Sequence, residues 1–180
     1  MKHRPSARPC AVDRPEELAV VSLGSNLGDS RAVILTAMGR LQEWSDGPVI
    51  QSSLWQTSPV DCPPGSPPFV NAVAVLRPSV GLTADQLLDG LQALEKEFGR
   101  QRKKQLNEPR PLDLDIIWFL QEHRQDARLS LPHPRAHGRR FVLQPLAELL
   151  PEAVFPGQGK AVRSLLLDLD DREQVVRLND

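Results

Sequence analysis

The order in which strand-like and helix-like segments follow one another most strongly constrains the fold. Leu18 to Leu23 is a short apolar run that ends in a turn of Gly, Ser and Asn, which predicts a buried strand. Apolar residues then recur at helical spacing from Ser30 to Trp44. With Asp29 or Ser30 as the N-cap and Asp46-Gly47-Pro48 as the stop, this segment predicts an amphipathic helix.

Two more strands, a second helix and a last strand follow. Val49 to Gln56 has weak strand character, whereas Phe69 to Leu76 has strong strand character because β-branched residues repeat at every second position. Thr83 to Gln86 matches a capping box and opens a helical stripe that ends at Gly99. Leu112 to Leu120 predicts the last strand of this series.

The predicted order is therefore strand, helix, strand, strand, helix, strand. This βαββαβ order indicates an α+β fold with a ferredoxin-like core, in which helices cover one face of an antiparallel sheet. Extra C-terminal helices are expected at Arg140 to Leu150 and near Val162 to Leu169, and Pro145 requires a kink or a late start in the first. We expect residues 1–16 to form a disordered N-terminal extension and residues 17–180 to form a single domain.

Composition excludes several classes of protein. The formal net charge of −1 provides neither a broad basic field for nucleic acid nor a polybasic membrane anchor. No segment approaches the roughly 18 to 20 apolar residues that span a bilayer. Cys10 and Cys62 stand apart and suggest neither a disulfide framework nor a zinc site. We therefore expect a cytoplasmic, monomeric protein that binds small molecules, with no nucleic acid and no membrane partner.

Asp113 and Asp115 are the first candidates for chemistry. Alternate residues of a strand point to the same face, so these two carboxylates share a space about 6 to 7 Å wide. Their repulsion calls for a cation, and hard oxygen ligands of this kind suit Mg²⁺. The residues alone leave open a second interpretation, in which the pair is solvated on the open face of a sheet edge.

A group of cations lies just upstream of the two acids. Arginine forks bind phosphate oxygens through paired hydrogen bonds, and arginine together with a metal neutralises charge in phosphoryl transfer. A solvated basic loop is the alternative for this cluster taken alone, but its position beside Asp-Leu-Asp favours a polyphosphate site. The cations are Arg100, Arg102, Lys103, Lys104 and Arg110.

Other polar residues leave their roles open. Asn71 lies inside the strongest strand, where it is either a satisfied core amide or an amide that reads the edge of a pterin or purine. Gly24 to Gly28 lacks the Lys-Ser/Thr of a P-loop, so we interpret it as a structural turn. His133 is either a nucleotide contact or a loop histidine. The other histidines are interpreted as surface residues: His3, His123 and His137.

The ordered motifs from Leu18 to Pro156 resemble the hydroxymethyldihydropterin pyrophosphokinase family. The resemblance implies a ferredoxin-like core with three mobile loops, at Gly24 to Asp29, Thr57 to Pro68 and Gln101 to Leu112. The motifs that carry it are VVSLGSNLGD at 20–29, SSLWQTSPV at 52–60, PPFVNAVAVL at 67–76, EKEFGRQR at 95–102, EPRPLDLDIIWF at 108–119 and LPHPRAHGRRFVLQPLAEL at 131–149.

The resemblance also implies an activity and a set of site residues. The activity is transfer of a diphosphate from ATP to 6-hydroxymethyl-7,8-dihydropterin, which gives the pterin diphosphate and AMP in folate biosynthesis. Two Mg²⁺ ions would bind Asp113 and Asp115, which with Arg100 and Arg110 form the implied catalytic set. The implied ATP-binding residues are Gln92, Glu95, Arg100, Arg102, Arg110, His133 and Arg139. The implied pterin-binding residues are Thr57, Val60, Phe69, Asn71 and Phe141.

The chain departs from the family pattern at three places. Leu106-Asn107-Glu108 stands where family members commonly have Arg-Trp-Gly, so an aromatic side chain and a cation are missing there. Pro134 stands where a tyrosine is frequent, and Phe69 replaces the tyrosine that stacks on the pterin. The exchange of tyrosine for phenylalanine keeps the face of the ring, so we expect it to matter little.

Two alternatives to this activity remain. The altered loop favours a catalytically weak, ferredoxin-like regulatory module that binds a nucleotide, although such a module has little need of both Asp113 and Asp115. Another two-metal nucleotidyl or phosphoryl transferase is the second alternative. Phe69, Asn71 and Phe141 argue against it because they suit a flat heterocycle.

Overall fold

The computed structural model describes residues 14–58, 65–99, 109–170 and 174–179. The predicted βαββαβ order is confirmed. It consists of β1 (Ala19–Ser25), α1 (Ser30–Arg40), β2 (Ile50–Gln51), β3 (Trp55–Thr57), β4 (Phe69–Leu76), α2 (Ala84–Glu97) and β5 (Asp113–Phe119). The C-terminal part adds β6 (Arg124–Gln125), β7 (Ser130–Leu131), α3 (Arg140–Leu149), α4 (Val162–Asp168) and β8 (Val175–Arg177). Short 3₁₀ helices lie at Pro15–Glu17, Leu41–Trp44 and Ala136–Gly138.

The main sheet is antiparallel and has six strands. Its order is β5-β1-β4-β3-β8, and β2 pairs with β4 beside β3. The two longest pairings join β1 to β4 and β1 to β5, so β1 and β4 form the centre and β5 forms one edge. This strand order is the ferredoxin-like arrangement that the sequence predicted.

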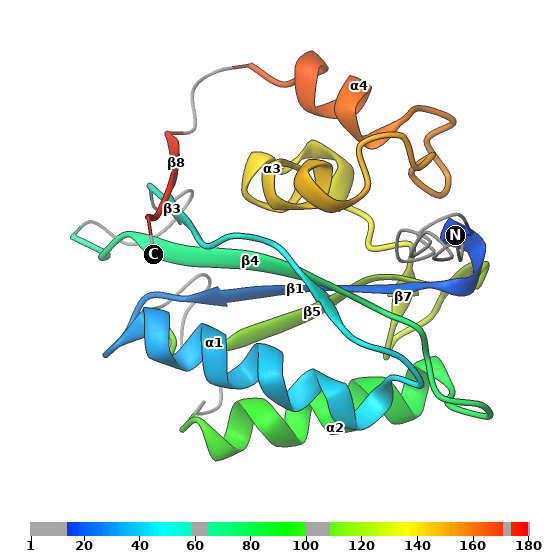
Figure 1. Ribbon diagram of the computed structural model, residues 1–180, viewed down its shortest axis with the longest axis horizontal. Helices are drawn as coiled ribbons and strands as arrows, with labels where there is room; N and C mark the ends of the chain where they lie inside the picture. The colour runs from blue at the N-terminus through cyan, green and yellow to red at the C-terminus, as the bar shows by residue number, and fades with distance from the viewer. Residues whose placement is uncertain (1–13, 59–64, 100–108, 171–173, 180) are drawn as a thin grey trace, which may run out of the picture.

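Helices cover both faces of the sheet (Figure 1). On one face, α1 and α2 bury alternate residues of the central strands, among them Val21 and Ala74. On the other face, α3 packs against the sheet, in a cluster with Val20 and Val75, and α4 packs against α3. The core pair of helices thus lies on one face as predicted, and the C-terminal helices close the opposite face.

Local chemistry fixes the ends of the two core helices. Asp29 Oδ1 accepts a hydrogen bond from the N–H of Ala32 at 3.0 Å and caps α1. Thr83 and Gln86 form the predicted capping box at the start of α2. Gly99, which follows the end of α2, has a φ of 85°, a conformation that glycine adopts without strain.

One predicted strand differs from the structure, and one of the two alternatives for a predicted helix is excluded. The strand predicted at 49–56 is divided into β2 and β3, because Ser52 Oγ accepts the N–H of Val73 in place of a backbone carbonyl. The first C-terminal helix does not start late, since Pro145 lies inside α3. A proline there cannot donate the helical hydrogen bond to the carbonyl of Phe141.

The N-terminal boundary predicted after residue 16 falls within the 3₁₀ helix Pro15–Glu17. Residues 1–13 lie outside the described residues. That residues 17–180 form one domain stays a prediction. Within the part of the chain that the structure describes, every helix is too short or too polar to cross a membrane.

Candidate active site

Alternate residues of three neighbouring strands form the floor of a cavity. In β5, Asp113 and Asp115 face the same side, as period two requires. In β1, Gly24 lies opposite both Asp113 and Asn71, and Ser22 lies opposite Asp115. The two acids and the amide of β4 therefore sit in adjacent rows on one face of the sheet, the face on which α3 packs.

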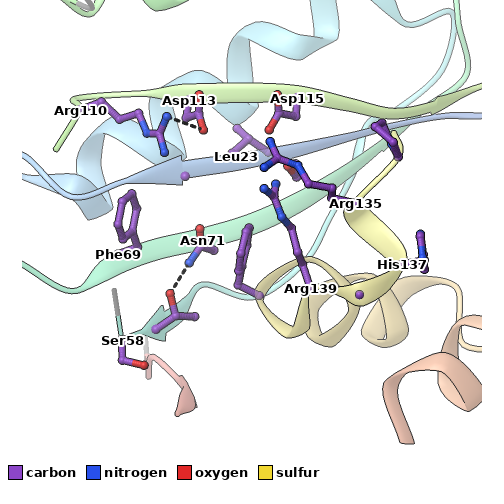
Figure 2. A pocket seen from close by; sticks show the side chains of 16 residues that line it. Leu23, Ser58, Phe69, Asn71, Arg110, Asp113, Asp115, Arg135, His137 and Arg139 are labelled. Carbon is purple, nitrogen blue, oxygen red and sulfur yellow. Dashed lines mark hydrogen bonds and ion pairs between the residues drawn. The ribbon is translucent and has the colours of Figure 1, made fainter. Parts of the chain in front are cut away.

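The cavity has a volume of about 540 Å³, within the usual range for a small-molecule site. Its second wall comes from the segment that leads into α3. Figure 2 shows acids, arginines and Phe69 around one space. The lining residues are Ser22, Leu23, Gly24, Thr57, Ser58, Phe69, Asn71, Arg110, Asp113, Asp115, Pro134, Arg135, His137, Gly138, Arg139 and Phe141.

The two acids are not a solvated pair on an open edge. Asp115 is half-buried and lines the cavity, as does Asp113. Burial raises the pKa of Asp115, and the neighbouring Asp113 carboxylate raises it further. A cation bound between the two carboxylates would relieve both effects. Two carboxylates are also the protein donors typical of Mg²⁺ sites that substrate phosphates complete, so these residues fit this metal.

Two arginines face the acids, and each contacts an aromatic ring. Arg110 Nη1 lies 3.3 Å from Asp113 Oδ2, and its guanidinium lies 5.9 Å from the centre of the Phe69 ring. The Arg139 guanidinium lies 5.4 Å from the centre of the Phe141 ring. Burial lowers the pKa of Arg139, and the nearby charge of Arg135 lowers it further. Arginine stays protonated in proteins. Its partly buried positive charge would therefore be stabilised by an anion bound beside it.

An amide and two aromatic rings form the side of the cavity away from β5. Asn71 Nδ2 donates to Thr57 Oγ1 at 2.7 Å, which orients the amide. A Cβ atom at Gly24 would lie 3.0 Å from Asn71 Oδ1, so a larger residue there would push the amide from its position. Asn71 is thus a partnered core amide that also lines the cavity, and its role in reading the edge of a heterocycle stays a prediction.

His133 lies beside the cavity rather than in its lining. Its backbone N–H donates to the carbonyl of Ile117 at 2.7 Å, and its Nδ1 accepts from the N–H of Arg135 at 3.2 Å. Burial lowers the pKa of His133, and the opposing charge of Asp115 counteracts part of this effect. The histidine is therefore near Asp115.

Other predicted site residues lie elsewhere. Gln92 and Glu95 belong to α2, on the opposite face of the sheet from the cavity. Gln92 is exposed, whereas Glu95 is buried and its Oε1 accepts the N–H of Leu114 at 2.7 Å. Their contact with adenosine stays a prediction. The following lie outside the described residues: Val60, Arg100, Arg102 and the run 106–108.

The sequence did not identify several residues of the cavity. His137, predicted on the surface, is half-buried and packs edge-on against Phe155 with ring centres 6.3 Å apart. The surface prediction is wrong for His137 because its neighbour in space lies 18 residues further along the chain. Arg135 was also missed, although it stands in the same His-Pro-Arg run as His133.

Paired carboxylates that face arginines across one cavity are typical of metal-dependent enzymes of phosphoryl transfer. Comparison with known proteins gives the particular family. Residues 20–151 match the model of the 7,8-dihydro-6-hydroxymethylpterin-pyrophosphokinase (HPPK) family. The chain therefore belongs to this family.

Relatives and solved structures agree with this assignment. The 2-amino-4-hydroxy-6-hydroxymethyldihydropteridine pyrophosphokinase of Pseudomonas aeruginosa is 39% identical over 147 residues, 81% of this chain and 88% of that protein. The enzyme of the same name from Synechocystis sp. is 38% identical over 152 residues, 84% of this chain and 76% of that protein. The solved Plasmodium falciparum HPPK-DHPS A437G with SDX-DHP matches with a TM-score of 0.64 at 16% identity. That match covers 83% of this chain but 45% of the Plasmodium chain, and it supports the fold alone.

Proposed function

We propose that this chain transfers a diphosphate from ATP to 6-hydroxymethyl-7,8-dihydropterin and releases AMP, a step of folate biosynthesis. In this reaction the hydroxymethyl oxygen attacks the β-phosphorus of ATP. The observation that carries the proposal is a single cavity with two carboxylates and arginines on one side and two phenylalanines with an amide on the other. The polyphosphate of ATP would bind on the charged side, and the flat pterin would bind on the aromatic side.

The acidic side would hold the metal. Asp113 and Asp115 are the residues that would bind two Mg²⁺ ions together with the phosphate oxygens. When bound, Mg²⁺ offsets the negative charge of the triphosphate and of the leaving AMP. The carboxylates are fixed by β5, whose pairing with β1 sets the register of both side chains. Their position therefore needs little rearrangement when ATP arrives.

The arginines would bind the phosphates. Arg110 already pairs with Asp113, so it can neutralise an oxygen of a phosphate that approaches the same acid. Arg139 stands at the start of α3 and points into the cavity (Figure 2). Preorganised cations of this kind stabilise the charge of the transition state.

The aromatic side would hold the pterin. Phe69 from β4 and Phe141 from α3 both line the cavity and offer ring faces for stacking. The hydrogen bond from Asn71 to Thr57 fixes the plane of the amide, so that it can read the polar edge of a heterocycle. Closure of the two walls around the substrate would exclude water from the attacking oxygen.

The same proposal includes a monomeric protein in the cytoplasm. The small net charge and the two isolated cysteines support it. Measurement of mass in solution would test the oligomeric state.

Product analysis tests the activity. Purified protein is mixed with MgATP and 6-hydroxymethyl-7,8-dihydropterin, beside Asp115→Ala and the control Asp168→Ala, whose carboxylate pairs with Lys160 on the surface. We expect AMP and pterin diphosphate from the wild type and the control. We expect Asp115→Ala to lose at least about 100-fold in rate, because several kcal/mol of charge stabilisation disappear.

Two outcomes would contradict the proposal. ADP as the product would indicate an ordinary kinase. Binding of ATP without any turnover would favour the nucleotide-binding regulatory module.

A further inference from the structure

Glu148, at the end of α3, joins this helix to the strands beside the cavity. Its Oε1 accepts from Ser53 Oγ at 2.6 Å, and its Oε2 accepts from Ser53 N at 3.0 Å and from Trp55 Nε1 at 3.3 Å. Arg177 Nη2 of β8 lies 3.4 Å from Oε1. One carboxylate therefore connects α3, β8, strand β3 and the residues that lead into β3.

The position of Glu148 is unfavourable for an acid unless it has such partners. It is the penultimate residue of α3, where the partial negative charge of the helix end repels a carboxylate. The partial burial of this carboxylate would alone raise the pKa of Glu148, but the hydrogen bonds from Ser53 and Trp55 and the charge of Arg177 outweigh it and lower the pKa. These contacts thus stabilise the charged carboxylate of Glu148. They hold it at a helix end where a neutral side chain would otherwise be more favourable.

Both ends of this connection lead to the pterin side of the cavity. Phe141 and Glu148 are seven residues apart, so they lie on the same face of α3, about 10 Å from each other along the helix. On the strand side, Trp55 precedes Thr57 by two residues and pairs with Asn71. The carboxylate therefore couples the helix that carries Phe141 to the strand that carries Thr57.

The C-terminal strand supports the same place. β3 has three residues and lies between β4 and β8. In the pairing of β3 with β8, Trp55 lies opposite Arg177 and Thr57 lies opposite Val175. The residues matched by the family model end at 151, so β8 lies beyond them. A strand this short has few hydrogen bonds of its own and depends on its neighbours for its position.

We propose that Glu148 is a positioning residue for pterin binding. It clamps α3 to β3, Arg177 of β8 completes the clamp, and the clamp sets the spacing between Phe141 and the Asn71–Thr57 pair. This inference rests on the proposed function for the identity of the heterocycle. Asp113 and Asp115 belong to β5. In the sheet, β5 and β3 are separated by three interstrand spacings, or about 14 Å. Loss of the clamp should therefore affect the pterin more than ATP.

Steady-state kinetics of Glu148→Ala test the clamp. The control is Glu152→Ala, which removes an exposed glutamate paired with Arg163. For Glu148→Ala we expect the KM for the pterin to rise about 10-fold, since misplaced positioning groups cost this much or more, while the KM for ATP stays within twofold. The control should match the wild type.

Two milder variants keep the test informative if Glu148→Ala folds poorly. Glu148→Gln keeps an acceptor for Ser53 or Trp55 and loses the ion pair with Arg177, so its KM for the pterin should lie between those of the wild type and Glu148→Ala. Trp55→Phe keeps an aromatic ring and removes one donor, and should raise the same KM by a smaller factor. Equal changes in both KM values, or no change in any variant, would overturn the clamp.

Hydrogen exchange separates this inference from the proposed function. We expect the amides of residues 52–58 to exchange faster in Glu148→Ala than in the wild type, with little change in β5. If the wild type forms no pterin diphosphate, the proposed function fails, and the exchange of residues 52–58 still decides whether the clamp exists. Unchanged exchange there would refute it.

Discussion

The edge strand β5 carries both acids of the candidate site, and Glu95 of α2 accepts a hydrogen bond from one outward-facing N–H of this strand. The N–H of Leu114, between Asp113 and Asp115, donates to Glu95 Oε1 at 2.7 Å. Because β5 is the last strand of the sheet, an N–H that points away from β1 has no strand partner. The carboxylate of Glu95, whose residue is 7% exposed, takes the place of the missing strand.

Glu95→Ala leaves this buried N–H without its acceptor. An unsatisfied buried donor costs about 1 to 3 kcal/mol of folding free energy. For a domain of this size each kcal/mol shifts Tm by about 2 to 4 °C, so we expect Tm to fall by about 2 to 12 °C. Glu95→Gln keeps a carbonyl oxygen at the same reach, so we expect it to retain more than half of this stability.

Activity should follow the same order. Since Leu114 lies between the two acids, a shift of β5 displaces both, and Glu95→Ala should lower kcat/KM while Glu95→Gln stays near the wild type. A contact between the charge of Glu95 and the nucleotide predicts a different pattern, in which Glu95→Gln raises the KM for ATP without loss of stability. Thermal unfolding and ATP kinetics of the two variants distinguish these roles. A Tm for Glu95→Ala within 1 °C of the wild type, or equal losses in both variants, would refute the reasoning.

Two further predictions concern a missed cation and a helical glycine that faces Trp44. Arg135→Gln should raise the KM for ATP about 10-fold, because a hydrogen-bonded charge at the phosphates is lost, and an unchanged KM would exclude Arg135 from the phosphate site. Gly90→Ala should lower Tm despite a helix-propensity gain of about 1 kcal/mol, because the new Cβ would lie closer than 3.0 Å to Trp44. Gly39→Ala, with nothing within 4 Å of its Cβ, is the control and should raise Tm; a rise in both variants would contradict the steric argument.

The sequence predicted the features that depend on residues close to one another along the chain. The capping box at Thr83 needs only a hydroxyl and an amide three residues apart, and the common face of Asp113 and Asp115 needs only a strand. The βαββαβ order then restricts the ways in which these strands can pair. Most of the fold and the floor of the site followed from such local patterns.

Features that depend on distant contacts could not be predicted in this way. The division of the strand at Ser52 depends on Val73, and the burial of His137 depends on Phe155. β8 has three residues, which is too few for a periodic signal. The hydrogen bond from Leu114 to Glu95 joins a helix to an edge strand 19 residues away, and nothing in the local sequence of Glu95 indicates it.

The face of the sheet under α3 changes from apolar to polar along β4 and β5, and this change places the site. In β4, Val75 and Val73 pack under α3, whereas Asn71 and Phe69 on the same face line the cavity. β5 shows the same change from apolar residues to acids. The cavity therefore lies where α3 begins, and Phe141 in its first turn forms the opposite wall. Since one end of α3 forms this wall, any contact that fixes the other end also sets the width of the cavity.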